Sequence, residues 1–341
     1  MARARTQAVG PLPVAINLLV VYVIWGSTYL AIRFVVETLP PFLAASARFL
    51  VAGALMLGFL WLRARLSRPA TRLEPMTWRH WRSAAIIGGL LLFGGNGFVS
   101  QAERYVDSGI AAVLIAAVPI WMSLFDAFVT RRRPSPLAIG GVAAGFVGIL
   151  VLLAPLNGVA SINPLGIGLA VFAAICWSAG SVYALYAPMP RSGLLGTGME
   201  MLAGGIMLAV AGLVIGEPAQ VDTGHVSAAS LLALSYLVVF GSLLAFSSYT
   251  WLLNHAPVST VATYAYVNPV VAVALGSVFV HEQITFRTLL ASALIIGAVV
   301  AMVTGRPART AEVAQVDPVA REPDTGSSGE RSEGGDPAPA D

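Results

Sequence analysis

Two stretches of similar pattern lie far apart in the chain, Ile24–Arg33 (IWGSTYLAIR) and Cys176–Tyr186 (CWSAGSVYALY). Each places a tryptophan and several small or hydroxyl residues inside an apolar run. Trp177 follows Trp25 by 152 positions. Self-similarity at a long, fixed offset is the mark of internal duplication, so the rest of the chain must be searched at the same spacing.

Further matches occur at nearly the same offset. RFLVAGALML, which begins at Arg48, aligns with EMLAGGIMLA, which begins at Glu200, and Pro119 in AAVLIAAVPI aligns with Pro269 in VATYAYVNPV. Chance similarity between apolar helices is the alternative explanation, but matched tryptophans and prolines at one spacing argue against it. We therefore predict duplication of a multi-helix unit.

The composition places most of the chain in lipid. Of 341 residues, 57% are hydrophobic and 11% are charged, and the mean hydropathy is +0.79. An ordinary globular domain carries about 25% charged residues. Apolar runs long enough to cross about 30 Å of hydrocarbon recur along the chain. We predict ten spans, at 14–34, 42–62, 83–102, 109–129, 137–155, 164–186, 195–215, 230–252, 259–280 and 286–304.

The predicted fold is an all-α polytopic membrane protein with ten transmembrane helices. Because five is odd, the second five-helix unit enters the membrane from the opposite side, which makes the two units inverted repeats. The substrate site of such a protein lies near the midplane, between the repeats. The predicted parts are a cytoplasmic N-terminus (1–13), a first repeat (14–155), a second repeat (164–304) and a disordered cytoplasmic tail (305–341).

Arginine placement sets the expected orientation. With the N-terminus inside, the cytoplasmic segments hold 14 arginines and the outer links hold three, Arg33, Arg104 and Arg287. The first span has no convincing cleavage site and is expected to be retained. We therefore expect a multi-pass protein with both termini in the cytoplasm. An all-arginine, alanine-rich chain also suggests a GC-rich bacterial genome, so the expected location is a bacterial plasma membrane.

Several chemistries are excluded or unsupported by residue usage. All 20 basic residues are arginine, so a lysine Schiff base and a P-loop lysine are impossible. The single cysteine, Cys176, allows no internal disulfide. We expect no cofactor, no metal site and no nucleic-acid partner. The four histidines are too scattered for metal binding; they are His80, His225, His255 and His281.

Two ionisable residues lie well inside predicted spans. Arg48 is about six residues from the outer end of the second span, roughly 9 Å deep, and Glu200 is about five residues from the cytoplasmic end of the seventh, roughly 8 Å deep. We expect each to face the central cavity from its own side, without a salt bridge between them. The alternative is that each side chain extends to the nearer interface.

Polar and aromatic residues gather at mid-depth in three spans. WGST (Trp25–Thr28) predicts a small, hydroxyl-rich break in the first span, GGNG (Gly94–Gly97) does so in the third, and TYAYVNP (Thr263–Pro269) marks the ninth. Pro119 and Pro269 are expected helix kinks. Ordinary helix packing is the alternative use of such small residues. The predicted cavity residues are Trp25, Ser27, Thr28, Tyr29, Arg48, Asn96, Trp177, Glu200, Thr263, Tyr264, Tyr266 and Asn268.

Two other features have a plainer expectation. Glu103, at the outer end of the third span, could line the outer mouth, although an interfacial charge needs no function. Small residues recur every four positions in the fifth and tenth spans, which fits either a homodimer face or, as we expect, packing within one chain. They are Gly140, Ala144 and Gly148, and Ala293, Gly297 and Ala301.

Over residues 14–304 the chain resembles the EamA branch of the drug/metabolite transporter superfamily, and within it the YedA-like inner-membrane members. The resemblance rests on IWGSTYLAIR, ETLPPFLAASARFLVAG, GNGFVSQAERYVDSGIAAVLIAAVP, GMEMLAGG and TYAYVNPVVAV. It implies ten helices in inverted repeats, alternating access and export of small metabolites. The matching positions are Trp25, Gly26, Ser27, Thr28, Arg48, Asn96, Glu103, Pro119, Glu200, Tyr264, Tyr266, Asn268 and Pro269.

The expected function is export of a small amphipathic metabolite, such as an amino acid, by a secondary transporter. Aromatic walls would hold the solute, Asn96 and Asn268 would supply hydrogen bonds, and Glu200 could carry a coupling proton. An importer or uniporter of the same fold is the first alternative, and a membrane-embedded enzyme is the second. The expected partners are the lipid bilayer, a small-molecule substrate and, less directly indicated, a second copy of the chain.

Overall fold

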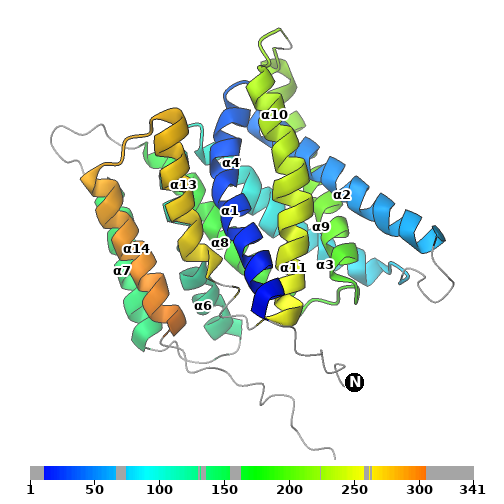
Figure 1. The fold of residues 1–341 in the computed structure, drawn as a ribbon, viewed down its shortest axis with the longest axis horizontal. Helices are drawn as coiled ribbons and strands as arrows, with labels where there is room; N and C mark the ends of the chain where they lie inside the picture. The colour runs from blue at the N-terminus through cyan, green and yellow to red at the C-terminus, as the bar shows by residue number, and fades with distance from the viewer. Residues whose placement is uncertain are drawn as a thin grey trace, which may run out of the picture. The chain divides into compact units, whose positions relative to one another are not determined.

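The structure is a computed structural model that describes residues 11–66, 74–129, 131, 136–153, 163–222, 224–256, 261 and 263–304. Within these ranges every regular element is a helix (Figure 1). The elements are α1 (Pro11–Val36), α2 (Pro41–Leu66), α3 (Trp78–Gly88), η2 (Gly89–Gly97), α4 (Phe98–Ala102), α5 (Ser108–Ile115), α6 (Val118–Val129), α7 (Pro136–Leu153), α8 (Pro164–Ala184), α9 (Gly193–Val214), η3 (Glu217–Gln220), α10 (Ala228–Tyr236), η4 (Leu237–Leu244), α11 (Ala245–His255), α13 (Tyr264–Val280) and α14 (Phe286–Thr304).

Seven helical stretches in the described residues are long and apolar enough to cross a membrane. They are Pro11–Val36, Pro41–Leu66, Trp78–Ala102, Ser108–Val129, Pro164–Ala184, Gly193–Val214 and Ala228–Leu252. The chain is therefore an all-helical polytopic membrane protein. Helices α13 and α14 lie within two of the three remaining predicted ranges, and α7 begins one residue before the third. The predicted tail, 305–341, lies outside the described residues.

The predicted break in the first span is wrong. Helix α1 runs without interruption from Pro11 to Val36. The hydroxyls of Ser27 and Thr28 donate back to the carbonyls of Ile24 and Trp25, at 2.8 and 2.6 Å. Hydroxyl residues are thus satisfied within the helix, and they need no break in it.

The third span is irregular where GGNG predicted it, but its helix widens instead of breaking. Residues Gly89–Gly97 form the π-helix η2, between α3 and α4. A second π-helix, η4 (Leu237–Leu244), joins α10 to α11. π-Helical turns inside α-helices occur frequently at functional sites, so both segments are candidates to border one.

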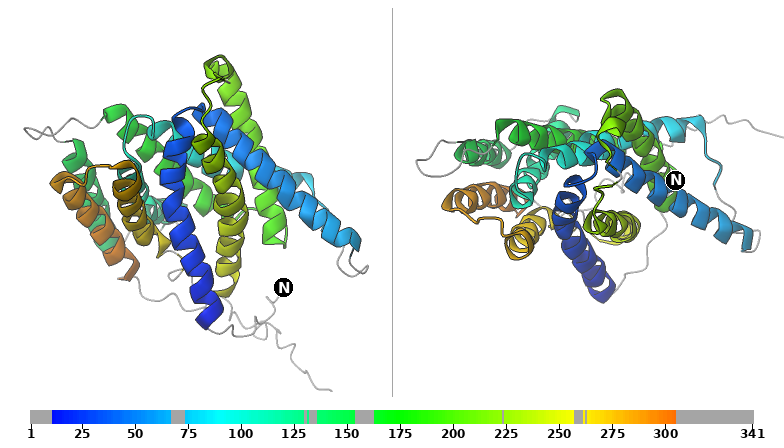
Figure 2. Two further views of the ribbon diagram at one scale, coloured as in Figure 1. Left: turned by 45° about the horizontal axis from the view of Figure 1, so that its top comes forward. Right: turned by 90° about the horizontal axis from the view of Figure 1, so that it is seen from above.

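The helices pack in a pattern of distinct pairs. Helix α2 packs along α9 and α7 packs along α14, while α1 contacts α13 and α6 contacts α8 (Figures 1 and 2). The segment η2 lies against α8, and η4 lies against both α1 and α2. Apolar clusters fill the space between them; one of them centres on Trp25, Phe49 and Phe246.

Close helix crossings depend on glycine. A Cβ at Gly88 of α3 would lie 2.4 Å from the carbonyl oxygen of Glu200 in α9. A Cβ at Gly148 of α7 would lie 2.7 Å from Ile295 of α14. Of the small residues of the fifth span, Gly148 therefore serves packing within one chain, whereas Gly140 faces open space.

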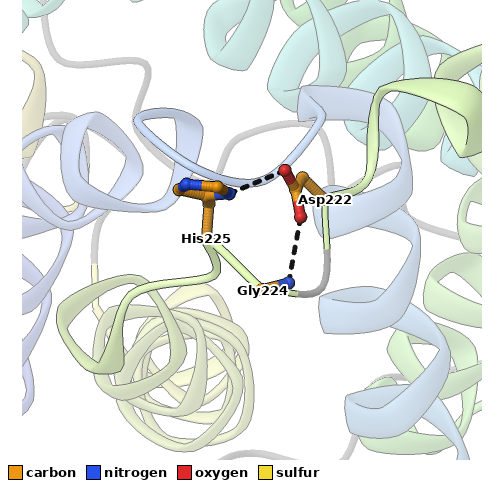
Figure 3. Close-up of polar contacts among 3 residues, drawn as sticks. All are labelled: Asp222, Gly224 and His225. Carbon is orange, nitrogen blue, oxygen red and sulfur yellow. Dashed lines mark hydrogen bonds and ion pairs between the residues drawn. The ribbon is translucent and has the colours of Figure 1, made fainter.

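Two carboxylates order the backbone at the end of the molecule where α1 ends. Glu217 accepts hydrogen bonds from the backbone N–H groups of Phe42 and Leu43, at the start of α2 (3.1 and 2.8 Å). Nearby, the link before α10 is held by Asp222, whose carboxylate accepts from the Gly224 N–H at 3.0 Å and lies 2.6 Å from His225 Nδ1 (Figure 3). Both ends of that last pair are exposed, so it adds little stability.

Candidate functional site

A cavity lies between helices from both halves of the chain. It contains about 730 Å³ of empty space, including the part open to solvent. Residues of α1, η2, α5, α6, α8, α11 and α13 contribute to its wall, with one residue each of α2 and α4. The predicted cavity residues that line it are Trp25, Thr28, Tyr29, Arg48, Asn96, Trp177, Tyr264 and Asn268.

Trp25 is the centre of the aromatic part of the wall. Its ring centroid lies 5.0–5.3 Å from those of Phe246, Tyr249 and Tyr264, and 6.3 Å from that of Trp177. Its indole N–H donates to the carbonyl of Gly241 in η4 at 3.3 Å. Edge-to-face contacts and this hydrogen bond fix the ring, and the wall thus presents a rigid aromatic surface.

Arg48 is the cationic group of the cavity. The side chain is 4% exposed, and its Nε donates to the Ser242 hydroxyl of η4 at 2.9 Å. Its guanidinium lies 4.7 Å from the centroid of the Phe49 ring. No carboxylate pairs with Arg48 among the described residues. A buried guanidinium with an aromatic neighbour and no anion is suited to bind an anionic group that enters the cavity.

Two amides add polar groups to the wall. Asn96 of η2 donates to the Leu91 carbonyl at 3.3 Å, which supplies the partner that its predicted depth required. Asn268 is 5% exposed and donates to the carbonyls of Tyr264 and Tyr22, each at 3.3 Å. In this orientation the Asn268 oxygen also faces a donor of the protein, whereas the carbonyl oxygen of Asn96 can accept a hydrogen bond from a solute.

Four predicted cavity residues do not contribute a described side chain to this wall. Ser27 contacts the Tyr236 hydroxyl at 2.6 Å, and Thr263 bonds to the Tyr22 hydroxyl. Glu200 is half-buried on α9, beyond the cavity wall and near Tyr249. Tyr266 is part of α13, but its side chain lies outside the described residues.

The two prolines behave differently. The helix is interrupted between Ile115 and Val118, immediately before Pro119, as a proline at that position predicts. Ser178 of α8 donates to the Val118 carbonyl at 3.0 Å, which satisfies backbone beside the interruption. Pro269 lies inside α13, and the helix continues through it.

Several wall residues were not predicted because they are ordinary apolar residues. Phe246 of α11 packs against Trp25. The cavity is also lined by small side chains, which leave room beside the aromatic rings; they are Ala112, Ala116 and Ala173. Nothing in their local sequence separates them from lipid-facing or core residues. Only the tertiary arrangement selects them.

Comparison with known proteins identifies the family. The model of the EamA-like transporter family matches the chain twice, at residues 12–154 and 164–304. The inner membrane transporter YedA of Escherichia coli K12 is 40% identical over 297 residues, which cover 86% of this chain and 92% of YedA. The transporter YvbV of Bacillus subtilis is 23% identical and covers 83% of this chain and 88% of its own.

A solved crystal structure shares the fold. It superposes with a TM-score of 0.56 at 22% sequence identity, over 86% of this chain and 96% of its own. The relatives carry the names of transporters and not of enzymes. With two family matches that together cover nearly all of residues 12–304, the chain belongs to the EamA-like transporter family.

Proposed function

We propose that the protein is a secondary transporter that exports a small amphipathic metabolite, such as an amino acid, by alternating access. The observation that carries the proposal is the aromatic cavity in which Arg48 has no carboxylate partner among the described residues. Its rings suit the apolar part of a solute. The guanidinium suits a carboxylate, because it can donate two parallel hydrogen bonds.

The Asn96 amide completes a site for a zwitterion. The carbonyl oxygen of Asn96 is an acceptor, and an ammonium group is a donor with three N–H bonds. A solute with a carboxylate, an ammonium and an apolar side chain would therefore find a partner for each of its parts. Such a distribution of few polar groups in an apolar wall is typical of small-molecule sites.

The proposal includes ten transmembrane helices arranged as two inverted repeats. Helix contacts support this. If each helix of the first repeat is replaced by the helix at the same place in the second repeat, and the reverse, the same pairs of positions are in contact. Exchange of the halves turns the contact of α1 with α13 into that of α8 with α6, and the contact of α8 with η2 into that of α1 with η4. The counterparts α2 and α9 pack on one another, as do α7 and α14.

Individual residues support the same exchange. The matched tryptophans, Trp25 and Trp177, meet edge to face across the cavity. Glu217, in the link after α9, caps the start of α2. In the corresponding link after α2, Glu74 accepts a hydrogen bond from the Arg191 N–H, just before α9, at 2.7 Å. Inverted repeats place the binding site between the halves, where this cavity lies.

We further propose that the protein is located in a bacterial plasma membrane, with both termini in the cytoplasm. The excess of arginine in the links assigned to the cytoplasm supports this orientation. The relative YedA is an inner membrane transporter. In this orientation the links after α1, α4, α7, α9 and α13 face the outside.

Counterflow in proteoliposomes tests the transport activity without assuming a driving force. Vesicles loaded with an unlabelled amino-acid mixture should take up a radiolabelled member of that mixture transiently, and the label should be recovered chemically unchanged. Trp25→Ala should reduce uptake, because it removes the centre of the aromatic wall. Failure of the wild-type protein to exchange any amino acid would reject this substrate class.

Glu200, which lies beyond the cavity wall near Tyr249, is our candidate for a proton-coupling group on the cytoplasmic side of the membrane. It is an acidic residue within the apolar helix α9, where an ionisable side chain marks a functional candidate. Glu200→Gln should remove accumulation driven by a pH gradient and spare counterflow. Unchanged gradient-driven accumulation in that variant would exclude the role. If the protein is an importer, the pH gradient would drive accumulation in the opposite direction. If it is a uniporter, the gradient would drive no accumulation.

A further inference from the structure

Glu103 is a completely buried carboxyl group that makes no hydrogen bond among the described residues. It follows α4 directly, its side chain is 0% exposed, and neither carboxylate oxygen has a partner. The sequence suggested an ordinary charge at the membrane interface, which would remain in contact with water. A buried carboxylate without a donor is strongly disfavoured, whereas a protonated carboxyl is far less so.

The charged groups around Glu103 do not compensate its charge. Arg33 of α1 lies close by, but its Nη1 donates to the backbone carbonyl of Glu103 at 2.9 Å and not to the carboxylate. Two other acids face the same region: Asp107, before α5, and Glu282, after α13. The hydroxyl of Tyr29 faces it from α1. Arg33 is a cation that acts on both Glu103 and Asp107, and it forms no ion pair with the Glu103 carboxyl within the described residues.

The helix packed behind this region brings no charge. Helix α8 contacts α4 and α5 through residues that include Gly166, Ile167 and Ala170. Burial and the charge of Glu282 raise the pKa of Glu103 well above its ordinary value, and Arg33 opposes them. These surroundings therefore favour the neutral form of Glu103.

Two neighbouring glutamates show what a structural role looks like. Glu282 accepts hydrogen bonds from the Ser108 N–H, the Ser108 hydroxyl and the Gly109 N–H (2.9, 2.7 and 3.1 Å), and caps α5. Glu217 is equally buried, at 1% exposed, and caps α2. Among the residues that the structure describes, the Glu103 carboxyl caps no helix and bonds to no side chain, so packing there does not explain its presence.

Glu103 lies directly behind residues that line the cavity. One turn before it on α4, Val99 lines the cavity, and Tyr29, which lines the cavity from α1, faces Glu103. Arg33 follows Tyr29 by one turn on the same helix. A movement of α1 relative to α4 would therefore change both the shape of the cavity wall and the groups that surround Glu103.

We propose that Glu103 is a proton-binding site on the outer side of the cavity, distinct from Glu200, and that its proton is coupled to transport. In the described arrangement the carboxyl oxygen holds the proton. Release of that proton to outside water leaves a carboxylate, which draws the Arg33 guanidinium from the backbone carbonyl and shifts α1 relative to α4. This inference rests on the proposed transport function.

Infrared spectroscopy tests proton binding independently of transport. The full-length protein in lipid is titrated from about pH 5 to about pH 9, beside Glu103→Gln. The wild-type spectrum should contain a protonated-carboxyl C=O band, lost with rising pH, that is missing from the variant. Glutamine mimics the neutral acid, so this variant should fold. Identical carboxyl bands in the two proteins over this range would overturn the proposal.

Proteoliposomes test the coupling, with the radiolabelled amino-acid mixture as the probe. Glu103→Gln should keep counterflow and lose accumulation driven by a pH gradient. Asp107→Asn is the matched control: it removes a half-buried acid at the same end, preserves a residue that can cap α5, and should keep both activities. Gradient-driven accumulation by Glu103→Gln at the wild-type level would overturn the coupling. If the wild-type protein shows no counterflow, the transport function is rejected. The infrared titration would still decide whether Glu103 binds a proton.

Discussion

At the scale of single residues, three buried or half-buried glutamates at one end of the molecule differ only in their partners. Glu217 and Glu282 accept backbone N–H groups at helix starts, where carboxylates are favoured by the helix dipole. The carboxyl group of Glu103 accepts no hydrogen bond within the described residues. The same side chain therefore serves as a cap at two positions and is free to bind a proton at the third.

Removal of the cap at Glu217 should destabilise the protein. Glu217→Ala leaves the N–H groups of Phe42 and Leu43 buried without an acceptor, at a cost of about 1–3 kcal/mol. Thermal unfolding of the purified protein in detergent measures the loss. Glu37→Ala, at an exposed glutamate near the end of α1, is the control and should leave Tm unchanged. Equal Tm values for both variants would show that the cap is unimportant.

Stability should depend on pH through two acids. Burial, with the charge of Glu282 added, raises the pKa of Glu103 and of Asp107. Each acid thus binds its proton more tightly when folded, so stability is greatest at low pH and falls as pH rises from the unfolded pKa towards the folded one. Between about pH 5 and about pH 8, Tm of the wild type should fall, and Glu103→Gln should flatten the fall. A wild-type Tm that rises over this interval would contradict the assignment.

Arg48 should determine affinity for the carboxylate of the solute. Arg48→Gln keeps a polar group but loses the charge, and a hydrogen bond to a charged group is worth about 1.5–3 kcal/mol, or roughly a tenfold to hundredfold change in Kd. Quenching of tryptophan fluorescence by an amino-acid mixture reports binding, because Trp25 and Trp177 line the cavity. Arg63→Gln, at an exposed position of the same helix, should bind as the wild type does. Equal affinity in both variants would remove Arg48 from the site.

The sequence alone could identify the cavity residues that are unusual for a membrane helix. Arg48, Asn96 and Asn268 are costly in lipid, so their presence predicts a polar neighbourhood. It could not assign Ser242 as the partner of Arg48, because that contact depends on how η4 packs against α2. The sequence also predicted that Glu200 faces the cavity, whereas it lies beyond the cavity wall. The depth of a residue in the membrane follows from its position in the span, but the direction in which its side chain points depends on how the helices pack.

At the scale of helices, the π-helical segments η2 and η4 are the elements that shape the site. Gly95 and Asn96 of η2 line the cavity, and η4 supplies the Gly241 carbonyl for Trp25. GGNG gave a local sign of η2, but LVVFGSLL gives none for η4. Propensity does not encode a π-helix; packing against neighbouring helices selects it.

The crossing of α3 and α9 should tolerate no side chain at Gly88. A Cβ there would meet the backbone of Glu200 at 2.4 Å, and backbone cannot move aside as a flexible side chain can. Gly88→Ala should therefore cost about 1–3 kcal/mol, the usual range for overpacking. Gly58→Ala, with open space around the new methyl group, is the control. The Tm of each variant in detergent measures the difference, and equal values would mean that the two helices are not in close contact.

At the scale of the whole molecule, one offset in the sequence predicted the relation between the halves, and the helix contacts support it. The matched positions Trp25 and Trp177 were expected to be equivalent, but nothing in the sequence showed that their rings would meet. Equivalence follows from alignment, whereas contact follows from the way the repeats interlock. The family matches, at 12–154 and 164–304, fall on the same two halves.

The central claim is that this cavity moves a small carboxylate-bearing solute out of the cell. It is tested most directly by the metabolites in the medium of cells that lack the protein, overexpress it, or overexpress Arg48→Gln at the same membrane level. At least one small amphipathic solute with a carboxylate should accumulate in the medium with the wild-type protein, and less of it should accumulate with the variant. Identical media from all three cultures, or depletion of such a solute by the wild type, would contradict the account.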